Sequence, residues 1–167
     1  EAVTKVSGDA RAGSFTWHPR GRIYHLREVG LGTFELFRMR ADGSDVEQLT
    51  EESNILGAAA VSWDEGVAWY IRLRPGAVDE SELVRHDLRE GSVEVIGGER
   101  IANPRLSIDD RFLIVTLDDG ADLNVAALDA ESGAQLSVLT RSDDADSSGA
   151  IAPVESGPIL IVSGADE

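Results

Sequence analysis

Short runs of apolar residues, separated by turn-forming residues, make up most of this chain of 167 residues. The segment 34–50, FELFRMRADGSDVEQLT, alternates apolar and polar residues on both sides of Ala-Asp-Gly-Ser, as two strands of a hairpin do. We expect strands here near 14–17, 22–29, 34–40 and 45–49, joined by turns rich in Pro, Gly and Asp. The pattern therefore predicts an all-β chain.

Units of this kind recur along the sequence with a nearly constant period. One marker is the apolar residue that closes each hairpin, at steps of 46 and 44 residues: Leu49, Val95 and Leu139. A second marker is a residue of the apolar strand that follows a short polar turn, at steps of 46, 45 and 46 residues: Tyr24, Tyr70, Val115 and Ile161. Two markers with one period indicate a repeat architecture.

The segment 121–139, ADLNVAALDAESGAQLSVL, is the one stretch where helix propensity competes with this interpretation. Its place in the repeat argues for a hairpin, because Glu131-Ser132-Gly133 falls where Ala41-Asp42-Gly43 falls in the first unit. We therefore predict two strands and a turn.

Four strands in about 45 residues are typical of a β-propeller blade. The predicted domain is a partial propeller of about 3.75 blades, whose boundaries are a strand in 1–8, blades at 13–50, 55–97 and 101–141, and a partial blade at 147–167. Exposed blade edges favour association. Either the strand at Val3–Ser7 closes a small ring with the last pair of strands, or two chains form a homodimeric ring of about eight blades.

The repeats resemble the TolB-type, WD-like propeller family. The residues that carry the resemblance are Trp17-His18-Pro19-Arg20-Gly21 before an apolar strand, then Ala41-Asp42-Gly43-Ser44, then Leu49-Thr50. The second unit departs from it, since Ile96-Gly97 stands in place of Leu-Thr. Similar repeats build the N-terminal propellers of prolyl oligopeptidase-like serine peptidases, which carry their catalytic residues on a separate hydrolase domain. The resemblance implies a propeller and places no catalytic residue in this chain.

The net charge of −16, with 31 acidic and 15 basic residues, argues against nucleic acid and anionic membranes as partners. The chain has no cysteine, and no apolar run reaches the ~20 residues that span a bilayer. We expect a soluble protein, either cytoplasmic or periplasmic or secreted. Because the sequence begins with Glu1, we expect a processed or excised segment.

The segment 144–155 has the oxygen-ligand spacing of a calcium loop, with Gly149 at its sixth position. The candidate ligands are Asp144, Asp146, Ser148 and Glu155. No flanking helix is predicted, and the alternative is a polar connection between blades. Calcium is the only cofactor that the sequence suggests.

A cluster of arginines in the first unit is a candidate surface for an acidic peptide partner: Arg20, Arg22, Arg38 and Arg40. Arg38 and Arg40 alternate with apolar residues and so share one face of a strand. The alternative is that these arginines pair with the many carboxylates nearby. Trp17, Trp63 and Trp69 are expected to pack between blades, with ligand stacking as the alternative for one of them.

The sequence contains no nucleophile elbow and no phosphate-binding glycine loop. We therefore expect a non-catalytic propeller scaffold that binds a protein or peptide. Two alternatives stay open: a substrate-gating propeller segment of a prolyl oligopeptidase-like serine peptidase, and a calcium-stabilised structural domain.

Overall fold

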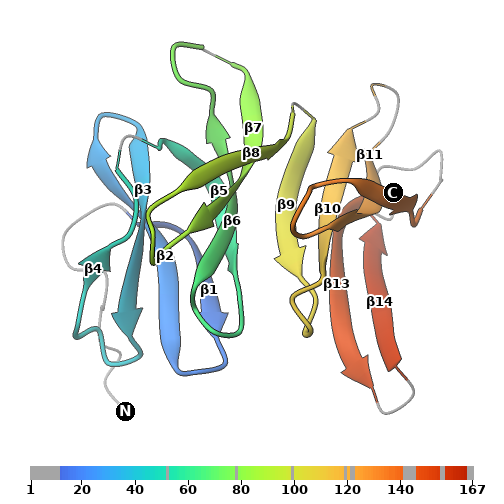
Figure 1. Cartoon of the computed structure of the whole chain (residues 1–167), viewed down its shortest axis with the longest axis horizontal. Helices are drawn as coiled ribbons and strands as arrows, with labels where there is room; N and C mark the ends of the chain where they lie inside the picture. The colour runs from blue at the N-terminus through green and yellow to red at the C-terminus, as the bar shows by residue number, and fades with distance from the viewer. Residues whose placement is uncertain are drawn as a thin grey trace.

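The chain folds into antiparallel β-sheets (Figure 1). The computed structural model describes residues 12–51, 53–77, 79–98, 100–118, 120, 123–140, 146–154 and 157–164, the last two ranges as backbone only. Every regular element in these residues is a strand, and none of them forms a helix long and apolar enough to cross a bilayer. The predicted fold class is confirmed, while the strand expected at Val3–Ser7 lies outside the described residues.

Three sheets of four strands follow one another along the chain. The first contains β1 (Ala12–His18), β2 (Arg22–Gly30), β3 (Thr33–Arg40) and β4 (Glu47–Gln48). The second contains β5 (Ile55–Val61), β6 (Val67–Leu73), β7 (Ser81–Asp87) and β8 (Val93–Gly97). The third contains β9 (Ile101–Leu106), β10 (Phe112–Asp118), β11 (Leu123–Asp129) and β12 (Gln135–Val138).

A fourth, two-stranded sheet pairs β13 (Asp146–Val154) with β14 (Gly157–Gly164). Within each four-stranded sheet the strands lie side by side in chain order, which is the arrangement of a propeller blade. No closed ring of sheets is present in the described part of the chain, so the fold is a partial β-propeller. The segment with high helix propensity forms the β11–β12 hairpin, as its place in the repeat predicts.

The first strand of each sheet lies on the inner side of the arc. Strand β5 packs against both β1 and β9, and β13 packs against β9, β10 and β11. The turns that follow β1, β5 and β9 all lie at the same end of the sheets, the lower end in Figure 1. This convergence positions the candidate site.

Two apolar cores lie between successive blades. The core between the first and second sheets is built around Tyr24, Leu36 and Tyr70, whose side chains are fully buried. The core between the second and third sheets includes Trp69 and Leu113. Because the middle strands bury both faces, they read in the sequence as continuous apolar runs.

The register of the sheets corrects one repeat marker by a single residue. Thr16 pairs with Tyr24, Ala60 with Trp69, and Arg105 with Ile114. The structural equivalent of Tyr24 is therefore Trp69, whereas Tyr70 points to the opposite face. A step of one residue reverses the face of a side chain, and two adjacent aromatic residues in β6 hid the shift from sequence comparison.

The Leu-Thr ending of the repeat has a direct structural role. The hydroxyl of Thr50 accepts a hydrogen bond from the Leu36 amide at 2.9 Å, and that of Thr140 accepts one from the Val125 amide at 2.9 Å. Each threonine therefore accepts a hydrogen bond from a backbone amide of the third strand just after the fourth strand ends. In the second sheet Gly97 pairs with Leu83 instead, which explains why the motif is absent there.

Candidate functional site

Three equivalent turns form one end of the inner strands. The first residue of each turn is buried, and its carbonyl accepts a backbone hydrogen bond of 2.9 to 3.0 Å from the residue three positions on: His18, Ser62 and Ser107. The donor residues adopt a left-handed backbone, with φ of 80°, 60° and 58°: Gly21, Glu65 and Asp110. The repeated geometry places the same turn positions of all three blades around one point.

The residue after the buried position is apolar in all three turns. It is Pro19 in the first turn, Trp63 in the second and Ile108 in the third. Trp63 is 48% exposed and Ile108 is 65% exposed. Exposed large apolar side chains at equivalent positions form a patch that a folded chain does not need for its own core.

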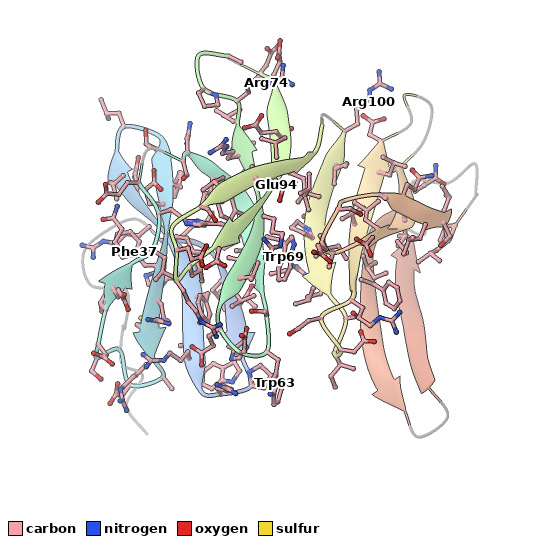
Figure 2. The ribbon with its side chains drawn as sticks, viewed as in Figure 1. Phe37, Trp63, Trp69, Arg74, Glu94 and Arg100 are labelled. Carbon is pink, nitrogen blue, oxygen red and sulfur yellow. The ribbon has the colours of Figure 1, made fainter. Side chains whose placement is uncertain are left out.

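A pocket of about 480 Å³ opens between these turns and the inner strands. Its walls come from β1, β5 and β9 and include the exposed residues Phe15 and Trp17. Figure 2 shows Trp63 at the end of the sheets where the turns converge, well away from the buried Trp69. The charged side chains on the wall are Arg105 and Asp110. A concave apolar pocket with a few polar groups is typical of ligand sites.

The turns are also locked to one another by hydrogen bonds. His18 Nε2 lies 3.1 Å from the Ser62 carbonyl oxygen, and the Arg20 amide donates to His18 Nδ1 at 3.3 Å. The Trp63 amide donates to Asp110 Oδ2 at 2.8 Å. Two of these contacts join neighbouring turns and the third orders the first turn, so the turns around the pocket are held in place.

Asp110 and Asp64 have opposite electrostatic environments at the rim. Burial raises the pKa of the Asp110 carboxyl above its ordinary value of 3.8, and the nearby carboxylates of Asp64 and Asp109 act in the same direction. Hydrogen bonds from Ser62 and Gly66, together with the Arg89 guanidinium, lower the pKa of Asp64 to about 2. The Asp64 carboxylate is therefore ionised at neutral pH, whereas the site of Asp110 disfavours its charged form.

The arginine cluster of the first blade is engaged with carboxylates. Arg22 lies 3.4 Å from Asp45 and 3.6 Å from Glu65, and Arg38 lies 2.6 Å from Glu47. Arg40 lies 3.3 Å from Asp45, and Arg20 is an exposed residue of the β1–β2 turn. These ion pairs fit the pairing interpretation of the cluster. Binding of an acidic peptide by Arg20, Arg22, Arg38 and Arg40 stays a prediction.

The three tryptophans do not share one environment. Trp69 packs between blades as expected, with 4% exposure and a 2.7 Å hydrogen bond from Nε1 to the Ala130 carbonyl oxygen. The expectation is wrong for Trp17 and Trp63, which are 57% and 48% exposed and line the pocket. Trp17 lies near the end of β1, and Trp63 lies in the turn that follows β5.

The calcium prediction concerns residues that the structure describes only in part. Asp146 and Ser148 belong to β13, whose backbone pairs with β14, and the other two candidate ligands, Asp144 and Glu155, lie outside the described residues. Elsewhere in the described part of the chain no three His, Asp or Glu side chains gather as a metal site would require. Calcium binding stays a prediction, which the melting temperature with and without a chelator would test.

Sequence reasoning did not find the pocket, although one signal for it was present. The three turns align at Pro19, Trp63 and Ile108, and the large apolar residues Trp63 and Ile108 are unusual at a turn position. Asp110 gave no such signal, because its role depends on the neighbouring blade. Only the convergence of three turns makes these residues a site.

Comparison with known proteins supports the fold. No family model and no curated protein matches the sequence. Among solved structures, one described as TolB from Agrobacterium tumefaciens superposes with a TM-score of 0.76 at 15% identity, over 95% of this chain and 57% of that one. Puromycin hydrolase gives 0.66 at 20% identity, over 96% of this chain and 30% of that one.

The β-propeller domain of the Trilobed protease from Pyrococcus furiosus gives a TM-score of 0.61 at 12% identity, over 95% of this chain and 55% of that one. The resemblance to TolB and to peptidase propellers is thus confirmed at the level of fold, while the WD-like part of it stays a prediction. This chain spans a little more than half the length of the TolB structure and of the Trilobed protease propeller domain.

Proposed function

We propose that this chain is a non-catalytic β-propeller scaffold that binds a protein or peptide segment in the pocket between the β1–β2, β5–β6 and β9–β10 turns. The observation that carries the proposal is the exposure of Trp17 and Trp63 on the wall of that pocket. Exposed tryptophans in a pocket are the typical anchors of protein recognition.

The rigidity of the rim supports the same proposal. The amide of Trp63 is held by Asp110, and the ring of His18 packs 6.2 Å from the ring of Trp63. A rigid aromatic surface loses little conformational entropy when a ligand covers it. The pocket is therefore suited to binding an extended segment rather than to closing over a reaction.

The experiment is selection of binding peptides from a displayed random library with the full chain as target. We expect the selected peptides to bind the Leu31→Ala variant like the parent, since Leu31 is a fully exposed apolar residue in the turn at the opposite end of β2. Trp63→Ala and Trp17→Ala are expected to weaken binding about ten-fold or more. Equal binding by all three variants would contradict the proposed location, and an empty selection would contradict peptide binding itself.

A second candidate is the substrate-gating propeller segment of a prolyl oligopeptidase-like serine peptidase. The observation that favours it is the similarity of the fold to puromycin hydrolase and to the propeller domain of the Trilobed protease. The coding sequence beyond residue 167 tests it. A hydrolase domain with a Gly-x-Ser-x-Gly elbow would support this candidate, and its absence would remove it.

We further propose that the chain completes its ring with a second copy, giving a homodimer of about eight blades. The support is the partial arc of three four-stranded sheets and one two-stranded sheet in the described residues. Light scattering tests it directly. Twice the chain mass is expected, and a strict monomer at all concentrations would exclude the dimer.

A further inference from the structure

One corner of the pocket combines an exposed indole with a fixed carboxylate. The Trp63 amide donates to Asp110 Oδ2 at 2.8 Å, so the carboxylate of Asp110 is held beside the residue whose ring forms the pocket wall. Trp17, a second exposed aromatic residue, belongs to the lining of the same pocket. An indole face and a carboxylate are the two groups that bind a planar cation most strongly.

Carboxylates and arginines both lie around this corner, within a chain of strongly negative net charge. Burial raises the pKa of Asp110, and the nearby carboxylates of Asp64 and Asp109 add to this increase. Asp64 is paired with Arg89 at 2.7 Å, and the net charge of the whole chain is −16. Such a field concentrates cations at the mouth of the pocket.

Two other groups on the wall bear on the choice of ligand. Both ring nitrogens of His18 are engaged within the rim, one with Ser62 and one with the Arg20 amide. Arg105 is the basic side chain on the wall, and it lies on β9, five positions before Asp110 in the chain. The wall itself carries one carboxylate, Asp110, and one guanidinium, Arg105. The net charge of −16 favours a cation, and Arg105 supplies the competing hypothesis of an anionic ligand.

We infer that Trp63, Trp17 and Asp110 form a subsite for the guanidinium group of an arginine in the bound peptide segment. The inference rests on the proposed function and adds the chemical class of the ligand. A guanidinium is planar and weakly hydrated, so it stacks on an indole and at the same time donates to a carboxylate. An ammonium group cannot stack in this way, and arginine is therefore favoured over lysine.

The test compares three short peptides of the form acetyl-Ala-Gly-X-Gly-Ala-amide, with arginine, citrulline or glutamate at X. Citrulline has nearly the shape of arginine without its charge. Titration calorimetry at low salt with the full chain is expected to show the arginine peptide binding about ten-fold more tightly than the citrulline peptide.

The decisive variant is Asp110→Asn, because asparagine tolerates the left-handed backbone and can still accept the hydrogen bond from Trp63. It is expected to abolish the difference between the arginine and citrulline peptides. Asp42→Asn is the matched control, since it removes the same charge from an exposed hairpin of the first blade. Denaturation curves of both variants verify that they are folded.

Each other outcome overturns the inference. Equal binding of the arginine and citrulline peptides removes the arginine subsite but leaves peptide binding in the pocket intact. If the glutamate peptide binds more tightly than the arginine peptide, the pocket binds an anionic ligand through Arg105. Equal effects of Asp110→Asn and Asp42→Asn reduce the preference to general charge attraction. Failure of all three peptides, together with an empty library selection, overturns the proposed function as well.

Discussion

Tyr24 of the first blade and Glu65 of the second are joined by a hydrogen bond of 2.8 Å from the tyrosine hydroxyl to Glu65 Oε2. Tyr24 is buried, and Glu65 is also 3.6 Å from Arg22 and 3.7 Å from Arg38. Glu65 reaches back to the first blade from the left-handed position of its turn, and Asp110 reaches back to the second blade from the equivalent position. The turns that line the pocket therefore also hold the blades in register.

The Tyr24–Glu65 contact is expected to stabilise the junction of the two blades. A hydrogen bond to a charged group contributes about 1.5 to 3 kcal/mol to the free energy of unfolding. A double-mutant cycle of Tyr24→Phe and Glu65→Gln, measured by urea denaturation, is expected to give a coupling of about 1 to 2 kcal/mol. The control cycle is the exposed Arg40–Asp45 pair, for which a much smaller coupling is expected. Equal coupling in the two cycles would show that the hydrogen bond between the blades contributes no more to the free energy of unfolding than an exposed ion pair does.

Gly133 and Gly91 occupy the same hairpin position in successive blades, and both have φ of 71°. A Cβ at Gly133 would overlap the carbonyl group of Ile96 in β8, whereas a Cβ at Gly91 would enter open space. Gly91→Ala is expected to cost about 1 to 2 kcal/mol from backbone strain alone. Gly133→Ala is expected to cost at least about 2 kcal/mol more, because the β11–β12 turn must move away from the second blade. Thermal denaturation compares the two, and similar losses would argue against close packing of the turn on β8.

Trp69 and Trp63 are expected to differ sharply in their effect on stability. Trp69→Phe removes the hydrogen bond to Ala130 and leaves a cavity between the second and third blades, at an expected cost of about 2 to 3 kcal/mol. Trp63→Phe is expected to cost less than about 1 kcal/mol, because the side chain is 48% exposed. Urea denaturation followed by circular dichroism measures both. A larger loss at Trp63 would place that residue in the core rather than on a ligand surface.

Asp64 and Asp110 are expected to affect the pH dependence of stability in opposite directions. The pKa of Asp64 falls from 3.8 to about 2 on folding, so its contribution is complete above pH 3.8 and is lost as the pH falls towards 2. Asp64→Asn should therefore destabilise the protein at pH 7, and the difference from the parent should fade between about pH 4 and pH 2.

The pKa of Asp110 is raised on folding, so its ionisation destabilises the folded state as the pH rises above 3.8. Asp110→Asn should remove this loss. The free energy of unfolding of the variant, relative to that of the parent, should therefore be higher at pH 7 than at pH 3. Urea denaturation at a series of pH values measures both variants. Slopes of the same sign would mean that Asp110 is not held in a partly buried site.

The sequence by itself determined the strands, the turns and the repeat. Continuous apolar runs bounded by Gly, Pro and Asp predicted the middle strands, and the period resolved the ambiguous segment 121–139 in favour of the β11–β12 hairpin. These features are local, because strand periodicity and turn chemistry are properties of neighbouring residues. The arginine cluster was also visible, together with the carboxylates expected to pair with it.

Only the tertiary structure decided which of these residues share a site. The face to which Tyr70 and Trp69 point depends on a register of one residue, which the period could not resolve. The exposure of Trp17 and Trp63 depends on how the inner strands and their turns meet at one end of the sheets, and the position of Asp110 depends on a turn of the neighbouring blade. Contacts between blades join residues about 45 positions apart, and such contacts leave no pattern in the sequence of either partner.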